Sequence, residues 1–213
     1  MQLYDYFRSS ASYRVRIALA LKGLDCELVP VHLLRNEQLK APFSAMSAAG
    51  LVPLLKDGDE LLTQSLAIIE YLDEVHPQPP LLPPGPAARA RVRALALAIA
   101  GEIHPLDNLR VLQYLKGTLG VADAQKDAWY KYWIDIGFEA LERQLARDPA
   151  TGTFCHGESP TLADLCLVPQ MANARRMAID VAAYPTLVRI DAAARALPAF
   201  AAAAPEVQED GES

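Results

Sequence analysis

A proline-rich segment at residues 76–86, HPQPPLLPPGP, divides the chain into two parts of different character. Proline fixes φ and lacks a backbone N–H, so a segment with this many prolines can continue neither a helix nor a central strand. Strand-like and helix-like patterns alternate before it, whereas alanine, leucine and arginine dominate after it. The segment is therefore predicted to separate a domain at residues 1–80 from a domain at residues 87–204.

The part before residue 76 has the pattern of a small α/β unit. A helical pattern that starts near residue 11 stops at Gly23, and glycine is common just after the last turn of a helix. The pair Asp57-Gly58 separates two β-prone runs and signals a hairpin. The order β-α-β-α-β-β-α predicts a sheet with parallel and antiparallel strands. The predicted strands cover residues 2–6, 26–33, 51–55 and 60–62, and the predicted helices cover 11–22, 36–46 and 65–75.

The part after residue 86 shows helical spacing throughout and is predicted to be all-helical. Thr161 and Asp164 have the spacing of a capping box, in which two side chains satisfy backbone N–H groups at a helix start. The acidic residues 205–213 offer few apolar anchors and are expected to form a flexible tail. Helices are expected near residues 87–116, 123–147, 161–178 and 185–196.

Charge and composition argue against several kinds of partner. The net charge of −6 is unfavourable for nucleic acid, because phosphate binding needs a basic face. The apolar stretches fall far short of the ~20 residues that cross a bilayer, and the N-terminal residues lack the pattern of a secretory signal. A cytoplasmic protein without a membrane partner is expected. Cys26, Cys155 and Cys166 lack disulfide or zinc spacing, so they are expected to be reduced core residues, and no metal site is predicted.

Three turns carry polar residues where a strand ends or a helix begins. Ser9 and Ser10 precede the first helix, whose N-terminal N–H groups suit an anion, although a serine there can simply cap the helix. Val52-Pro53 opens a strand, where a cis proline would leave backbone groups free for a peptide-like ligand and a trans edge proline would not. Gln64-Ser65 marks a further helix start, with Ser65 as its expected N-cap. Ligand sites of α/β units usually form at such places.

The run RSSASYRVRIAL, residues 8–19, resembles the signature of the zeta-class glutathione transferases, a family that includes maleylacetoacetate and maleylpyruvate isomerases. Residues 51–53, 64–72, 103–105 and 164–170 are similar to the same family in sequence and order, so the resemblance covers nearly the whole chain. It implies a thioredoxin-like N-terminal domain followed by an all-helical C-terminal domain, the glutathione transferase fold. It also implies a homodimer and glutathione as the cofactor.

The resemblance implies roles for individual residues in binding glutathione. Ser9 would hydrogen-bond the sulfur, the backbone of Val52 would pair with the cysteinyl part, and Gln64 with Ser65 would hold the γ-glutamyl end. One hydrogen bond to a charged acceptor is worth roughly 1.5 to 3 kcal/mol, which lowers a thiol pKa by about one to two units. Further candidates for binding glutathione are Ala11, Gln38, Pro53, His104 and Asn108, and the alternative for His104, which precedes Pro105 near a helix kink, is a purely structural role.

Two departures from the family pattern limit these roles. Many zeta-class members have Ser-Ser-Cys where this chain has Ser9, Ser10 and Ala11, so no cysteine can act as a nucleophile or thiol donor in this turn. The loop MSAAG at residues 46–50 lacks the Asn-Pro and glutamine-type residues that are common there. The residues predicted to be catalytic are Ser9, Ser10 and Arg8, and Ser9 would activate the thiol of the cofactor because the turn has no thiol of its own.

The substrate that the resemblance implies is a small dicarboxylate, converted from a cis to a trans isomer by addition and loss of a thiolate. Arg8, Arg110 and Arg176 are candidates to bind its carboxylates and to stabilise the enolate, since guanidinium groups bind carboxylates in bidentate fashion. The alternative for Arg110 and Arg176 is a solvated helix face. Arg110 favours maleylpyruvate over maleylacetoacetate as the substrate, because maleylacetoacetate isomerases more often look uncharged at that position.

Two other functions stay open at the level of sequence. One is a general transferase that conjugates or dehalogenates small electrophiles and consumes glutathione. The other is a binding module that keeps the fold for protein contacts without catalysis. The presence of Ser9, Gln64 and Ser65 argues against the second function.

Overall fold

The computed structural model describes residues 1–208, which form two compact units. The first unit contains Met1–Leu81 together with the chain from Ala196 onward, and the second contains Leu82–Arg195. The division falls inside the proline-rich segment. Residues 196–204 were expected in the helical domain but pack within the first unit, because Phe200 is completely buried and its carbonyl accepts a hydrogen bond from Tyr13.

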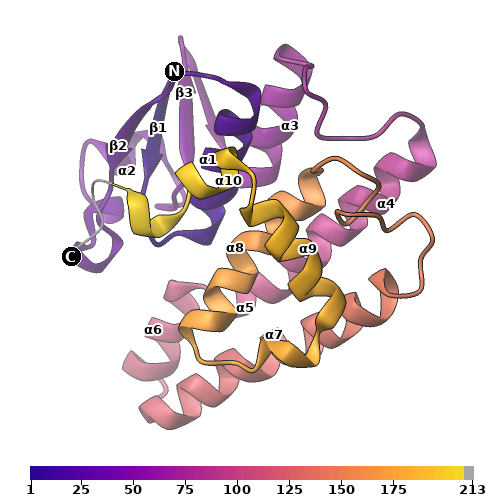
Figure 1. The fold of residues 1–213 in the computed structure, drawn as a ribbon. Coiled ribbons are helices and arrows are strands. Elements are labelled where there is room, and N and C mark those ends of the chain that lie inside the picture. The colour runs from indigo at the N-terminus through magenta and orange to yellow at the C-terminus, as the bar shows by residue number, and fades with distance from the viewer. Residues whose placement is uncertain (209–213) are drawn as a thin grey trace. The chain divides into compact units, whose positions relative to one another are not determined.

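The first unit is built on a four-stranded sheet with the order β2-β1-β3-β4 (Figure 1). Strand β1 (Gln2–Asp5) pairs in parallel with β2 (Glu27–Pro30) and antiparallel with β3 (Leu54–Asp57). Strand β4 (Glu60–Thr63) continues from β3 as a hairpin. This mixed sheet confirms the thioredoxin-like α/β fold expected for the N-terminal part.

Helices α1 (Ser10–Lys22) and α3 (Ser65–Val75) pack against each other in this unit, and α10 (Pro198–Ala202) packs on α1. Helix α1 ends as predicted at Gly23, which adopts φ 63°. The prediction of one helix over residues 36–46 is wrong. Asn36 adopts φ 57°, which no right-handed helix accepts, and Pro42 supplies no N–H. The segment instead forms η1 (Leu33–Arg35), η2 (Glu37–Leu39) and the single turn α2 (Phe43–Met46).

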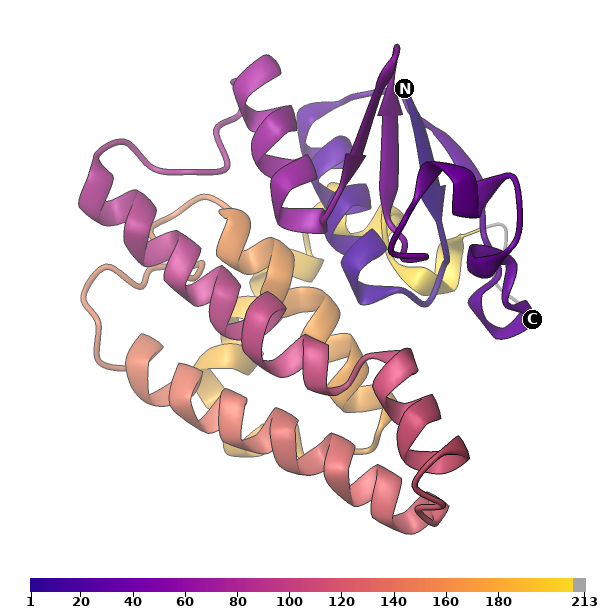
Figure 2. The ribbon, with the colours of Figure 1, turned by 180° about the vertical axis from the view of Figure 1, so that it is seen from behind.

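The second unit is helical, and the chain bends repeatedly between α4 and α6 (Figure 2). A continuous helix over residues 87–116 was expected, but the structure interrupts it after Leu97. Pro105 lacks the N–H that would continue the ladder, and Asn108 starts a new helix by accepting a hydrogen bond from the N–H of Arg110 at 3.1 Å. The elements are α4 (Pro86–Leu97), the π-helical segment η3 (Ala98–Ile103), α5 (His104–Leu106), α6 (Leu109–Gly117), α7 (Asp123–Leu145), α8 (Leu162–Arg176), η4 (Val181–Ala183) and α9 (Pro185–Arg195).

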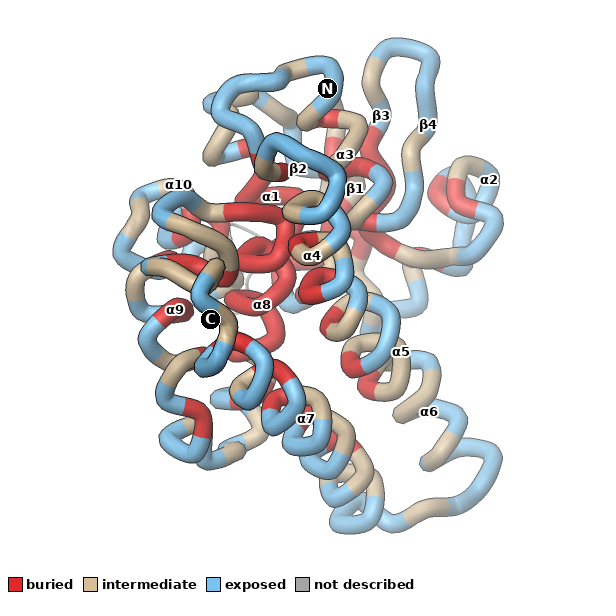
Figure 3. The backbone as a smooth tube through the Cα atoms, turned by 90° about the vertical axis from the view of Figure 1, so that its right-hand side faces the viewer, coloured by how far each residue is buried: buried red, intermediate tan, exposed pale blue. Residues whose placement is uncertain are grey.

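Helices α1 and α8 are the most deeply buried helices of their units (Figure 3). The predicted capping box at the start of α8 is confirmed. Asp164 accepts hydrogen bonds from the N–H of Thr161 at 2.7 Å and from the Thr161 hydroxyl at 2.8 Å, and its other oxygen accepts from the N–H of Cys155. These bonds satisfy backbone donors that the helix start would otherwise leave unpaired.

The remaining predictions on the chain have mixed outcomes. Cys155 and Cys166 are buried and Cys26 is half-buried, and within residues 1–208 none of the three takes part in a disulfide bond. Pro205–Val207, placed in the expected tail, form the short helix η5, whereas residues 209–213 of that tail lie outside the described residues. Within residues 1–208, none of the helices combines the length and the apolar character that a membrane span requires.

Candidate functional site

The three polar turns of the first unit leave its sheet at one edge. Leu54, the first residue of β3, is opposite Tyr4 near the end of β1 and opposite Thr63 at the end of β4. The turn after β1 leads to Ser9, the turn before β3 contains Val52, and the turn after β4 contains Gln64 and Ser65. The strand register therefore brings together the three turns that were predicted to bind one ligand.

Ser9 is the N-cap of α1, and its side-chain oxygen accepts a hydrogen bond from the N–H of Ser12 at 3.2 Å. The hydroxyl has a single hydrogen, which this bond does not use, so it can still donate to another acceptor. Ser10 is buried, Ala11 is half-buried and Arg8 is exposed. The cap and the donor functions considered for Ser9 are therefore compatible in one side chain.

Arg16 stabilises the turn between β1 and α1 through its guanidinium group. Its guanidinium pairs with the buried carboxylate of Asp5 at 2.7 Å and donates to the carbonyl of Phe7 at 3.0 Å. A third hydrogen bond reaches the carbonyl of Ala203 at 3.0 Å. A charge-assisted bond on the residue just before Arg8 fixes the path of the backbone into Ser9.

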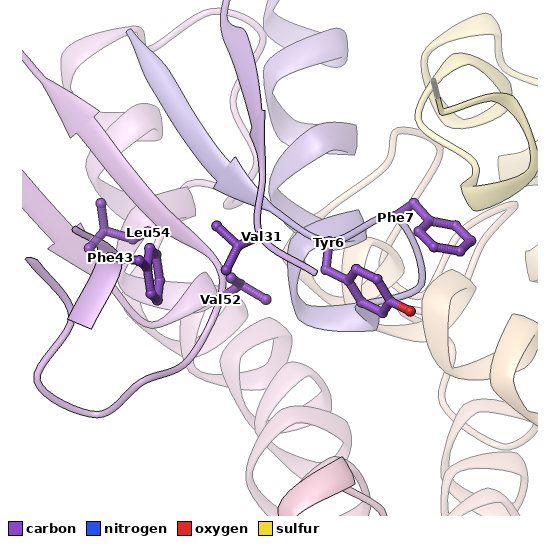
Figure 4. Packing of buried hydrophobic residues seen from close by; sticks show 6 residues of the cluster. All are labelled: Tyr6, Phe7, Val31, Phe43, Val52 and Leu54. Carbon is purple, nitrogen blue, oxygen red and sulfur yellow. The ribbon is translucent and has the colours of Figure 1, made fainter. Parts of the chain in front are cut away.

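Val52 precedes β3 and lies outside the ladder that begins at Leu54, and the Val52–Pro53 peptide bond is cis. Its side chain belongs to an apolar cluster that anchors the turn. Figure 4 shows Val31 and Val52 next to each other, with Phe43 beside Leu54. The other members of the cluster are Tyr6 and Phe7, with Tyr4, Leu33 and Met46 packed against it.

Gln38 lies beside the turn that precedes Val52. Gly50 adopts φ +60°, and a Cβ there would come within 3.3 Å of the carbonyl oxygen of Gln38. The Gln38 side chain is 8% exposed, and its oxygen has no hydrogen-bond partner among the described residues. A buried amide oxygen without a partner is costly, which makes this group suited to complete a bond with a ligand.

Gln64 and Ser65 stand at the start of α3, but their capping roles differ from the prediction. Gln64 is the N-cap, at φ 70°, and Ser65 is the first helical residue. In the part of the chain that the structure describes, the Gln64 side chain makes no capping hydrogen bond. Ser65 is buried and accepts a hydrogen bond from Arg14 at 3.2 Å. The N–H groups of this helix start are thus available to an anion.

The second unit contains the other candidates. His104 is the first residue of α5 and Asn108 is the N-cap of α6; both are half-buried, and Arg110 is exposed on α6. Arg110 was predicted on the first helix after the linker, but it lies on a separate helix because Asn108 caps a new start. The indole N–H of Trp129 donates to the carbonyl of Leu106 at 2.9 Å and ties this segment to α7.

Arg176 closes α8, as predicted, and contacts Tyr130 of α7. Its guanidinium donates to the Tyr130 hydroxyl at 3.2 Å and lies 5.9 Å from the ring centroid. Burial raises the pKa of Tyr130 to about 12. Asp107 is 6% exposed, burial raises its pKa to about 8, and its negative charge also acts on Tyr130. Across residues 1–208 neither carboxylate oxygen of Asp107 has a hydrogen-bond partner.

Three groups at these places were missed by the sequence analysis: Arg14, Asp107 and Tyr130. Arg14 lies at a buried position of α1 between apolar neighbours, which was a signal that could have been used. Asp107 and Tyr130 carry no comparable signal, since their burial depends on packing between α5, α7 and α8. Among the described residues no group of three or more His, Cys, Asp or Glu side chains could hold a metal ion.

The arrangement suits a peptide-like anion in the first unit and carboxylates in the second. The protein-family model described as the glutathione S-transferase N-terminal domain matches residues 3–80. A probable maleylacetoacetate isomerase from Vibrio cholerae is 54% identical over 210 residues, which cover 98% of this chain and 97% of that protein.

Two solved structures are similar over the whole chain. The holo structure of a maleylpyruvate isomerase, a bacterial zeta-class glutathione S-transferase, has a TM-score of 0.97 and 47% identity, with 100% of both chains covered. A maleylacetoacetate isomerase from Methylobacterium extorquens AM1, solved with bound malonate and glutathione, has a TM-score of 0.98 and 41% identity, again with 100% of both chains covered.

Proposed function

Because the chain belongs to the glutathione S-transferase family, and within it to the zeta class of the maleylacetoacetate and maleylpyruvate isomerases, we propose that it is a glutathione-dependent cis-trans isomerase. Its reaction converts maleylpyruvate to fumarylpyruvate or maleylacetoacetate to fumarylacetoacetate. The observation that carries the proposal is the common sheet edge of the turns with Ser9, Val52 and Ser65, because it combines a hydroxyl donor, free backbone groups and an open helix start.

The residues at this edge fit glutathione. The uncapped start of α3, with Gln64 and Ser65, would hold the γ-glutamyl carboxylate, and the backbone of Val52 beside Pro53 would pair with the cysteinyl part. The buried Gln38 oxygen, which lacks a partner within residues 1–208, would accept a hydrogen bond from the cofactor. Bound glutathione supplies a thiolate nucleophile, which makes rotation about the cis double bond possible.

Ser9 stabilises the ionised form of that thiol. Its oxygen already accepts from Ser12, so its hydrogen is directed elsewhere, and a sulfur at the start of α1 would receive it. The dipole of α1 adds to the effect. Ser10 and Ala11 are the first two residues of α1, directly after Ser9, and Arg8 precedes Ser9 and is exposed.

Arg8, Arg110 and Arg176 bind the carboxylates of the substrate. The hydrogen bond to Tyr130 restrains the guanidinium of Arg176, which favours a defined orientation for an incoming carboxylate. The relative with bound malonate supports a dicarboxylate as the substrate class. Arg110 favours maleylpyruvate, because the maleylacetoacetate isomerases more often look uncharged at that position.

The same family membership supports a proposed assembly and a proposed cellular location. The first unit binds glutathione and the helical unit binds the substrate, in a homodimer. His104 and Asn108 are the residues of the second unit that we propose for binding the cofactor. The protein acts in the cytoplasm, where glutathione is kept reduced.

Turnover of the two cis substrates tests the function. The protein should convert maleylpyruvate to fumarylpyruvate in the presence of catalytic amounts of glutathione, and faster than it converts maleylacetoacetate. Glutathione should not be consumed, which a thiol titration before and after the reaction measures. Rapid conjugation of chlorodinitrobenzene without any isomerisation would instead identify a general transferase, and the absence of glutathione binding in calorimetry would indicate a non-catalytic module.

A further inference from the structure

Arg14 is a buried cation next to the open start of α3. Its side chain extends from α1, is 1% exposed, and donates from Nη1 to the Ser65 hydroxyl oxygen at 3.2 Å. Burial of a guanidinium is costly unless its hydrogen bonds are placed well, so a position of this kind is tightly defined by its surroundings. One of the groups that define it is the serine at the first position of α3.

The bond from Arg14 determines where the Ser65 hydroxyl can point. A serine hydroxyl has one hydrogen and two lone pairs, and a guanidinium has donors only. Because one lone pair of Ser65 receives the Arg14 N–H, the hydroxyl hydrogen must turn away from Arg14. The hydroxyl is thereby prepared as a donor before any ligand arrives.

The start of α3 supplies the matching backbone donors. In the described structure the side chain of its N-cap, Gln64, makes no capping bond, and α3 is an 11-residue helix whose dipole favours an anion at this end. We propose that Arg14 is a positioning residue for the γ-glutamyl carboxylate of glutathione: it orients Ser65, so that the serine donates its hydroxyl hydrogen to that carboxylate.

This inference rests on the proposed function, since it assumes that glutathione binds at the edge with Ser9, Val52 and Ser65. Arg14 does not touch the ligand in this arrangement. Its influence should therefore be restricted to the γ-glutamyl end and should leave the chemistry at the sulfur unchanged. That restriction separates a positioning role from a merely structural one.

The test compares two fragments of glutathione on Arg14 variants. γ-Glutamylcysteine contains the γ-glutamyl carboxylate, and cysteinylglycine lacks it. In Arg14→Met the affinity for glutathione and for γ-glutamylcysteine should fall about tenfold, the usual scale for a lost bond to a charged group, while the affinity for cysteinylglycine should stay unchanged. KM for glutathione should rise with little change in kcat, and Arg14→Lys should restore most of the discrimination.

A double-mutant cycle with Ser65→Ala gives an independent measurement. With Ser65 removed, Arg14→Met should have almost no further effect on the affinity for γ-glutamylcysteine. Arg14→Gln, which keeps a hydrogen-bond donor without the charge, is measured in parallel. It replaces Arg14→Met if thermal melting shows that the methionine variant is not cooperatively folded. An equal loss of affinity for both fragments, or an Arg14 effect that persists without Ser65, would overturn the inference.

The same data distinguish the two levels of the proposal. If the unchanged protein binds no glutathione, the proposed function fails. If it binds glutathione and prefers γ-glutamylcysteine to cysteinylglycine, but Arg14→Met and Arg14→Gln keep that preference, only the role of Arg14 fails.

Discussion

The Ser9 hydroxyl accepts the N–H of Ser12 as a helix cap, and under the proposed function it also donates its hydrogen to the cofactor sulfur. Ser9→Ala should lose both. The cap contributes about 1 kcal/mol to the free energy of unfolding, whereas the bond to a thiolate changes the rate by about 10- to 100-fold. Urea unfolding measures the first effect, and the thiolate absorbance of bound glutathione as a function of pH measures the second. Ser9→Thr, which keeps a hydroxyl, is the control, and an unaltered thiol pKa in Ser9→Ala would contradict the role.

Tyr130 restrains the arginine at the end of α8. Its hydroxyl accepts from Arg176 at 3.2 Å, so Tyr130→Phe should leave the guanidinium less fixed while keeping the ring. A lost hydrogen bond of about 1 kcal/mol corresponds to an increase of roughly fivefold in KM for the dicarboxylate. Steady-state kinetics with glutathione varied separately provide the check. A change in KM for glutathione alone would show that Arg176 does not serve the substrate.

Asp107 makes the stability of the protein depend on pH. Its pKa is about 8 in the folded protein and near 4 in an unfolded chain, so the folded state holds the proton more tightly. The stabilising effect of this proton is complete below about pH 4 and is lost as the pH rises through 8. Relative to Asp107→Asn, the native protein should lose stability with a slope of at most about 1.4 kcal/mol per pH unit. The prediction would be refuted if the free energies of unfolding of the two proteins changed with pH in the same way between pH 5 and 8.

At the level of residues, the sequence sufficed for groups whose role depends on local backbone. Ser9 was assigned to the start of the first helix and Ser65 to the start of the helix over residues 65–75. The structure places both residues there, with Gln64 as the cap of α3 instead of Ser65. Arg14 and Asp107 could not be assigned in this way. Their importance comes from burial against residues distant in the chain, which local patterns do not encode.

Gly137 of α7 permits the close approach of η3, the π-helical segment that lies between α4 and α6 in the chain. A Cβ on Gly137 would collide with the side chain of Ile103, which is 3% exposed and directly precedes His104. Overpacking typically costs about 1–3 kcal/mol, and the gain in helix propensity from glycine to alanine is about 1 kcal/mol. Gly137→Ala should therefore destabilise the protein by about 1 kcal/mol, which urea unfolding measures.

Gly101 provides the matched control for that substitution. It belongs to the same π-helical segment, but a Cβ there would meet only Leu97 at 3.8 Å, an ordinary contact. Gly101→Ala should leave the activity unchanged and stabilise the fold by about 0.5 kcal/mol through the unfolded chain. Equal unfolding midpoints for the two variants would show that the contact with Ile103 does not limit the approach of α7.

The success of element prediction depended on how local the deciding contacts are. The capping box of Thr161 and Asp164 was predicted because both of its partners lie within one helical turn. The helix expected over residues 36–46 is wrong because Asn36 adopts a left-handed conformation and Pro42 supplies no N–H, and the pattern of apolar residues does not encode either feature. The break after Leu97 was missed because the periodicity of apolar residues continues through Pro105 although the hydrogen-bond ladder does not.

For the whole molecule, the return of the chain to the first unit had no signal in the sequence. No helix was predicted over the residues of α10, and the sequence pattern placed them in the helical domain. The hydrogen bonds from Tyr13 to Phe200 and from Arg16 to Ala203 decide this, and they join residues nearly the full length of the chain apart. Helix α1, which Ser9 caps, is thus stabilised by hydrogen bonds to Phe200 and Ala203.

Phe200 allows this dependence to be measured. Its side chain is completely buried, and truncation of a buried phenylalanine costs about 3–5 kcal/mol. Phe200→Ala should therefore lower the unfolding midpoint and weaken glutathione binding, because α1 loses its support near Tyr13. Phe200→Leu, which leaves a smaller void, should recover most of both properties. Urea unfolding and calorimetry with glutathione distinguish the possibilities: if Phe200→Ala unfolds earlier but binds glutathione as tightly as before, α10 stabilises the fold without supporting the turn at Ser9.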